Sequence, residues 1–153
     1  MSIENVLKTM KDEDVQYVDV RFTDPRGKLQ HVTLRYTEVD ADFLEEGFMF
    51  DGSSIAGWKS IDESDMKRIP DTESSYIDPF YAEKTLCIHC SVVEPDTREP
   101  YERDPRSVAE KAEAYLIASG IGDTAYFGPE AEFFLFDDVR FQVSMNKVSY
   151  QVD

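Results

Sequence analysis

The sequence predicts an α+β fold, with a small sheet in residues 1–103 and the start of a second unit in residues 104–153. Three observations predict it. Apolar residues recur at helical spacing near the amino terminus. Apolar and polar residues alternate on both sides of a turn at residues 23–27, as they do in a hairpin. Residues 84–93 then give the clearest strand pattern of the chain.

The first elements are a helix and a hairpin. Residues 3–12 predict a short amphipathic helix with Glu4 in its first turn, where a carboxylate stabilises the positive end of the helix dipole. Thr23-Asp24-Pro25-Arg26-Gly27 supplies turn residues between two alternating stretches. The apolar positions of these two expected strands are Val18, Val20, Phe22, Val32, Leu34 and Tyr36.

The next stretch predicts short elements around a loop. Residues 40–46 predict a helix that Asp40 caps and Gly47 ends. A loop is expected from Phe50 to Trp58. Ser60-Ile61-Asp62-Glu63 then has the spacing of a capping box, with room for about one helical turn.

The remaining residues predict a linker, a helix and a strand. The charged segment 94–104 contains two prolines and is typical of a linker. Asp104 as the cap, with Pro105 at the first helical position, predicts a helix that ends near Gly120. A strand is expected from about Thr124 to Phe136, and the last residues, 143–153, are expected to form a loop or a frayed end.

Composition excludes several classes of protein. Hydrophobic residues make up 41% and aromatic residues 12%, which is too much apolar material for a disordered tail. The net charge of −16 argues against nucleic acid and anionic membrane surfaces as partners. No stretch approaches the roughly 20 apolar residues that cross a bilayer, and the amino terminus lacks a signal-peptide pattern, so we expect a cytoplasmic protein with no membrane contact.

The two cysteines, Cys87 and Cys90, invite comparison with a redox or metal motif. They lie an odd number of residues apart on an expected strand, so their side chains should point to opposite faces. We therefore expect two reduced thiols that pack as small hydrophobic groups.

Glu130 and Glu132 are two carboxylates one residue apart in an otherwise apolar stretch. On a strand such residues share a face and lie roughly 6.5–7 Å apart. Hard oxygen ligands at this spacing suit two divalent ions, Mg²⁺ or Mn²⁺, with phosphate groups completing the coordination. The alternative is an edge strand whose acidic side faces water.

Asp51 lies in a turn with features of a reactive site. The dipeptide Asp51-Gly52 alone is typical of a structural turn, which is the alternative interpretation. Here two hydroxyl side chains follow it, and Trp58 closes the loop. For Ser53 and Ser54 the default role is to stabilise the turn through hydrogen bonds to the backbone.

Two strings, Phe50-Asp51-Gly52-Ser53-Ser54-Ile55 with Trp58 and Gly128-Pro129-Glu130-Ala131-Glu132-Phe133, resemble the amino-terminal part of bacterial type I glutamine synthetases. The resemblance runs from about residue 3 to the end of the chain. It implies a β-grasp amino-terminal domain followed by the first helix and strands of the catalytic domain.

The resemblance also implies roles for individual residues. Asp51 would reach the active site of the neighbouring subunit, where it helps to bind ammonium and to take its proton, and Trp58 would line the same site. Glu130 and Glu132 would each hold one of two metal ions. Arg21 and Arg103 are expected to hold turns or subunit contacts, without a catalytic role.

The implied reaction joins ammonia to L-glutamate with ATP as co-substrate, in a homo-oligomer whose active sites are shared between subunits. In the family this assembly is a dodecamer of two stacked hexagonal rings. The family's other metal ligands and most of its nucleotide site lie beyond Asp153. The chain alone is therefore expected to be inactive, as part of a longer enzyme.

Two alternatives belong to other classes. The chain could be an oligomerisation or regulatory module without catalysis, although such a module has no reason to keep Asp51, Glu130 and Glu132. It could also belong to a related ligase that joins glutamate to a polyamine. The aspartate that handles ammonium favours ammonia as the substrate.

Overall fold

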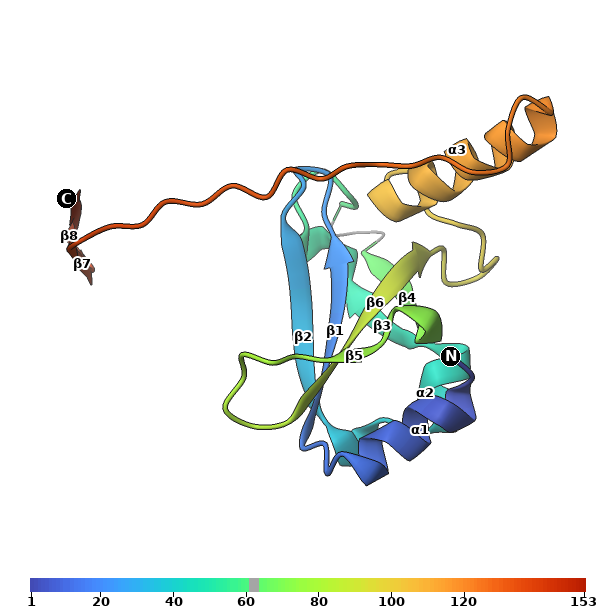
Figure 1. Ribbon diagram of the computed structural model, residues 1–153, viewed down its shortest axis with the longest axis horizontal. Helices are drawn as coiled ribbons and strands as arrows, with labels where there is room; N and C mark the ends of the chain where they lie inside the picture. The colour runs from blue at the N-terminus through green and yellow to red at the C-terminus, as the bar shows by residue number, and fades with distance from the viewer. Residues whose placement is uncertain (61–63) are drawn as a thin grey trace.

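The computed structural model describes residues 1–60 and 64–153. Its body is a six-stranded mixed sheet in the order β2-β1-β6-β4-β3, with β5 paired to β6 (Figure 1). The predicted α+β class is confirmed. The strands are β1 (Tyr17–Thr23), β2 (Leu29–Arg35), β3 (Phe48–Asp51), β4 (Asp65–Pro70), β5 (Tyr76–Ile77) and β6 (Thr85–Val93).

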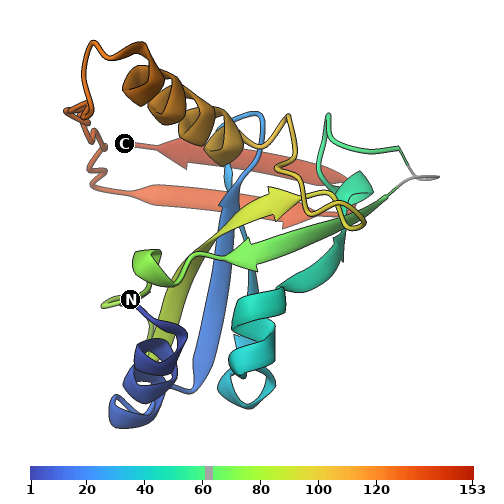
Figure 2. The same cartoon turned by 90° about the vertical axis from the view of Figure 1, so that its right-hand side faces the viewer.

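Helices α1 (Ile3–Asp12) and α2 (Ala41–Glu46) lie side by side at one end of the sheet (Figures 1 and 2). Both agree with the prediction. The Ser2 hydroxyl caps α1 by accepting a hydrogen bond from the Asn5 backbone N–H at 3.3 Å. The Asp40 carboxylate caps α2, and Gly47 follows its last residue with a φ of 75°.

The predicted hairpin is β1 and β2, which pair antiparallel. The carboxylate of Asp24 holds its turn, because Oδ1 accepts hydrogen bonds from the backbone N–H groups of Arg26 and Lys28, each at 2.9 Å. On its other side β1 pairs with β6 in parallel, so the clearest predicted strand lies inside the sheet.

A buried polar network ties β1 to its neighbours. Asp19 is fully buried and accepts hydrogen bonds from Arg21 Nε at 2.7 Å and Thr33 Oγ1 at 2.7 Å, and its Oδ1 lies 2.8 Å from His31 Nδ1. Arg21 also binds Asp78 at 3.0 Å. Burial alone would raise the pKa of Asp19, but these hydrogen bonds outweigh burial and lower it. Arg21 therefore has the structural role that the sequence predicts.

The prediction between residues 48 and 70 was partly wrong. Instead of a loop beginning at Phe50, the chain forms β3, and residues 65–70 form β4, which pairs antiparallel with both β3 and β6. The expected helical turn at residues 60–63 falls largely outside the described residues.

Strand β4 escaped prediction because a charged residue occupies a buried position. Arg68 is 4% exposed. Its guanidinium carbon lies 4.2 Å from the ring centre of Phe22 and 3.8 Å from that of Phe50. Within the described part of the chain its Nε and Nη1 have no hydrogen-bond partner, and burial lowers its pKa to about 10. Aromatic faces take the place of an acidic partner here.

Two clusters of apolar side chains form the core. The first packs α1 and α2 against β1 and β6, and its largest members include Met10, Leu44, Leu86 and Ile88. The second lies around β3, β4 and the loop after β3, and consists of Phe22, Ile55, Trp58, Met66, Val92 and Tyr101, with Phe50 packed against it.

Cys87 and Cys90 are both buried free thiols, as predicted. Burial raises the pKa of Cys87 to about 11 and that of Cys90 to about 12. Both thiols are therefore protonated and unreactive at neutral pH.

Helix α3 (Pro105–Ser119) begins and ends as the sequence predicts. The carboxylate of Asp104 caps it by accepting a hydrogen bond from the Arg106 backbone N–H at 3.2 Å. Gly120, with a φ of 70°, takes the left-handed conformation after its last residue. No helix in the described part of the chain is long and apolar enough to cross a membrane.

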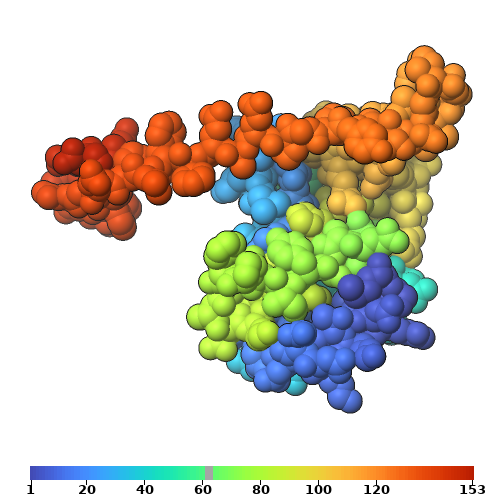
Figure 3. Space-filling model, in the orientation of Figure 1, coloured from blue at the N-terminus to red at the C-terminus, as the bar shows by residue number. Residues whose placement is uncertain are grey.

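The strand predicted from Thr124 to Phe136 does not form. After Gly120 the chain runs as an extended segment without helix or strand, called here the arm (residues 121–138), which passes α3 and then extends beyond the body (Figure 3). The aromatic residues of this stretch suit a strand, but a strand needs a hydrogen-bonded neighbour, and in the described part of the chain no strand pairs with residues 124–136.

The loop predicted at residues 143–153 is wrong as well. The chain forms an antiparallel hairpin of β7 (Val139–Ser144) and β8 (Lys147–Val152), with Met145 and Asn146 as its two-residue turn. Apolar residues alternate along both strands, which is typical of a hairpin. The hairpin was not predicted because its turn lacks the glycine that usually marks a two-residue hairpin loop.

Candidate functional site

Asp51 is the last residue of β3 and the cap of a short 3₁₀ helix, η2 (Gly52–Ser54). Its carboxylate is exposed. Oδ1 accepts two hydrogen bonds from Ser53, one from the hydroxyl at 2.6 Å and one from the backbone N–H at 2.8 Å. The Ser53 hydroxyl is the main cause that lowers the pKa of Asp51, followed by the Ser53 N–H, and the Ser64 hydroxyl contributes less.

Gly52 fits the turn because there is no room for a side chain. Its N–H donates a hydrogen bond to the Ser64 carbonyl at 2.6 Å. A Cβ atom added at Gly52 would lie 2.5 Å from Met66 Cγ and 3.0 Å from the Ser64 oxygen. Strand β4 therefore supports the Asp51 turn from one side, and the turn cannot move inward.

Trp58 lies in the core, 5% exposed. Its ring packs 5.4 Å from that of Phe22, 5.9 Å from that of Phe50 and 5.5 Å from that of Tyr101, measured between ring centres. Its Nε1 has no hydrogen-bond partner among residues 1–60 and 64–153. In this chain Trp58 anchors the loop that follows Asp51, and its predicted contact with a shared active site stays a prediction.

The segment before α3 also holds this loop. Arg103 Nη1 donates a hydrogen bond to the Gly57 carbonyl at 2.9 Å, and Gly57 itself has a φ of 88°. Lys59 Nζ pairs with Glu94 at 3.0 Å. The expectation that Arg103 holds a turn is thus confirmed, and the loop after Asp51 is tied to the residues that lead into α3.

Asp65 is a second acidic residue at this end of the sheet. It is the direct antiparallel partner of Asp51 in the β3–β4 pair, so both side chains project from the same face. Like charges in directly opposite positions are unfavourable, and a cation near both carboxylates would relieve the repulsion. Sequence analysis missed Asp65 because it missed β4, which alone brings the two residues together.

Glu130 and Glu132 lie on the arm, exposed to solvent. Neither makes a hydrogen bond or an ion pair with any described residue, and the structure does not bring them together with Asp51. Two unpartnered carboxylates are a donor set that fits Mg²⁺ or Mn²⁺. Within the described ranges no group of three or more His, Cys, Asp or Glu side chains is placed to hold a metal ion. Any complete site therefore needs further ligands.

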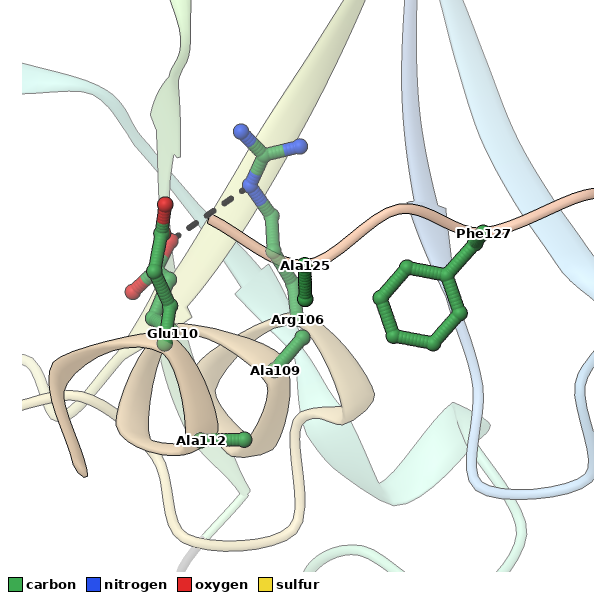
Figure 4. Close-up of a pocket in the computed structure, with 7 residues that line it drawn as sticks. Arg106, Ala109, Glu110, Ala112, Ala125 and Phe127 are labelled. Atoms are coloured by element: carbon green, nitrogen blue, oxygen red, sulfur yellow. Dashed lines mark ion pairs between the residues drawn. The ribbon is translucent and has the colours of Figure 1, made fainter. Parts of the chain in front are cut away.

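A pocket of about 430 Å³ lies where the arm passes helix α3 (Figure 4). Its walls are largely alanine side chains and the Phe127 ring, with an Arg106–Glu110 pair at 3.6 Å on one side. Arg106 also pairs with Asp71 on the body. None of the residues predicted from the sequence to be functional lines this pocket, and we assign it no chemistry.

Comparison with known proteins places both parts of the chain in one family. The family model for "Glutamine synthetase, beta-Grasp domain" matches residues 14–95, and that for "Glutamine synthetase, catalytic domain" matches residues 102–153. The glutamine synthetase of Cereibacter sphaeroides is 76% identical over 151 residues, and that of Rhodobacter capsulatus is 72% identical over 152 residues.

These alignments cover 99% of this chain but 32% and 34% of the two relatives, so the chain spans about a third of the length of the curated relatives it matches. A solved structure of Plasmodium falciparum glutamine synthetase superposes with a TM-score of 0.75 at 22% identity, over 99% of this chain and 29% of that one. This likeness supports the fold. The family matches mean that the chain belongs to the glutamine synthetase family.

Proposed function

We propose that the chain is the amino-terminal part of a glutamate–ammonia ligase, divided into a β-grasp domain (1–103) and the start of a catalytic domain (104–153). ATP phosphorylates the γ-carboxylate of L-glutamate and leaves as ADP. Ammonia then attacks the acyl carbon, phosphate departs, and the nitrogen loses a proton. The observation that carries the proposal is the Asp51 turn, an exposed carboxylate held in one place on a supported loop in a chain of this family.

Asp51 would act on the nitrogen substrate. A carboxylate whose pKa is lowered is fully ionised at neutral pH and attracts an ammonium ion. The same low pKa makes it a weak base towards free ammonium. It would therefore accept a proton from the bound ammonium only as the lone pair so released attacks the acyl carbon, so that formation of the nitrogen–carbon bond draws an otherwise unfavourable transfer forward. The second proton leaves the nitrogen after phosphate departs. Binding and proton transfer then use one group at two stages.

Glu130 and Glu132 would hold the divalent ions, Mg²⁺ or Mn²⁺. Ions held by these two carboxylates would supply positive charge next to the phosphate groups of ATP. The support is the donor set, two exposed carboxylates without protein partners on an extended segment.

The proposed assembly is a homo-oligomer, a dodecamer of two stacked hexagonal rings, with sites shared between subunits. Asp51 lies on the body and the two glutamates lie on the arm, so a site that uses all three can draw them from different copies of the chain (Figure 1). We propose the cytoplasm as its compartment, which suits two buried free thiols.

The test is Asp51→Ala in the complete protein that carries these residues. We expect ammonia-dependent turnover to fall by about a hundredfold or more while the affinity for ATP stays within about twofold, since Asp51 is assigned to the nitrogen substrate. Asp12→Ala, which removes an exposed carboxylate at the end of α1, is the control and should behave like the unsubstituted protein. Equal losses of turnover and ATP affinity would contradict the role of Asp51.

A further inference from the structure

Ser53 gives Asp51 one more hydrogen bond than the turn requires. The same turn occurs at Asp71 and at Asp78, where each carboxylate accepts the backbone N–H two residues ahead, at 3.0 and 2.9 Å. The residues at that position are Glu73 and Phe80, which supply the N–H alone. At Asp51 the corresponding residue adds a hydroxyl at 2.6 Å. The turn therefore forms without a hydroxyl, and its presence at Ser53 needs another explanation.

The two bonds from Ser53 end on the same oxygen. Both the hydroxyl and the N–H donate to Oδ1 of Asp51, so Ser53 leaves Oδ2 to other partners. Two donors on one oxygen restrict rotation of the carboxylate more than the N–H alone does, because both must be broken for the group to turn. The backbone beneath is already fixed by the contact of Gly52 with Met66.

We propose that Ser53 is a positioning residue of the ammonia reaction, whose hydroxyl and N–H hold Oδ1 of Asp51 so that Oδ2 faces the ammonium ion. This inference rests on the proposed function. It assigns Ser53 no contact with substrate, since Ser53 acts through Asp51.

The surroundings of the turn make such positioning useful. Asp65 lies directly opposite Asp51, and its negative charge pushes an unrestrained carboxylate away. The nearby cation, Lys59, is paired with Glu94. The Ser53 hydroxyl also lowers the pKa of Asp51, which keeps the carboxylate ionised for the cation it binds.

The first test compares variants of the complete protein. Ser53→Ala keeps the N–H and removes the hydroxyl, and we expect the KM for ammonium to rise about tenfold, as loss of one bond to a charged group predicts, with the KM for ATP unchanged. Ser53→Thr and Ser53→Val have the same shape, so they isolate the hydroxyl: Thr should restore the low KM and Val should resemble Ala. Ser75→Ala, which removes the Ser75 hydroxyl bond to the Thr72 carbonyl, is the control and should change neither KM.

The second test asks whether Ser53 acts through Asp51. In an Asp51→Ala background, Ser53→Ala should cause no further change in ammonia-dependent turnover, because the group it positions is gone. A full additional effect would overturn the inference, as would equal KM values for the Thr and Val variants. If the unsubstituted protein consumed no ammonia, the proposed function would fail, and this inference with it. An active protein that Ser53→Ala leaves unchanged would overturn only the role of Ser53.

Discussion

At the scale of single residues, the Asp51 turn depends on the close approach of Gly52 to β4 and on two hydrogen-bond donors that meet one carboxylate oxygen of Asp51. Ser53 supplies both hydrogen bonds to Oδ1, and Gly52 allows the turn to rest against Met66. The string Asp51-Gly52-Ser53 could be recognised from the sequence, but the expected role of the serine was wrong, because its hydroxyl binds the Asp51 carboxylate instead of the backbone. The contact that requires glycine could not be recognised, because it involves β4, whose pattern the buried Arg68 concealed.

Gly52→Ala should therefore weaken the turn. The new methyl group would meet Met66 Cγ at 2.5 Å, and overpacking of this kind costs about 1–3 kcal/mol. We expect a lower thermal unfolding midpoint in the complete protein and a higher KM for ammonium. Gly122→Ala is the matched control, since its added Cβ would make an ordinary contact of 3.6 Å with Leu116. Equal midpoints for the two variants would show that the turn can move away from β4.

At the scale of elements, the loop after Asp51 is held by the segment that leads into α3. Trp58 packs against Tyr101, and Arg103 binds the Gly57 carbonyl. The sequence predicts α1, α2, α3 and the first hairpin because their caps and periodicities are local signals. It does not predict the structure of residues 124–136, because an extended segment becomes a strand only where another strand pairs with it, and that strand lies elsewhere in the sequence.

Arg103→Ala should loosen that loop without unfolding the sheet. The variant loses the hydrogen bond to Gly57, and Trp58, the single tryptophan of the chain, should become more exposed to water. In the complete protein we expect the emission attributable to Trp58 to shift to longer wavelength and to become easier to quench, with a loss of stability of about 1 kcal/mol. Arg35→Ala, an exposed arginine on β2, is the control. An unchanged Trp58 spectrum in Arg103→Ala would mean that packing against Tyr101 holds the loop alone.

At the scale of the whole molecule, the chain separates the groups that the proposed reaction needs. The body carries Asp51 at the end of β3, and the arm carries Glu130 and Glu132. The arm also exposes a row of large apolar side chains that find no cover on this body: Tyr126, Phe127, Phe133, Phe134 and Leu135. An assembly of several copies would bring both kinds of group into shared sites.

Mixing of two inactive variants shows whether the sites are shared between subunits. Asp51→Ala and Glu130→Ala would be prepared as separate complete proteins, each with little ammonia-dependent activity, then dissociated and reassembled together. Suppose that Asp51 of one subunit serves the Glu130 site of its neighbour. An intact site then forms where a Glu130→Ala subunit supplies Asp51 and an Asp51→Ala neighbour supplies Glu130, which random mixing of equal amounts gives at about a quarter of the sites. We predict that activity returns in the mixture and not in either protein reassembled alone. A mixture that stays inactive, although each protein assembles normally, would show that both residues act within one subunit and would contradict the account.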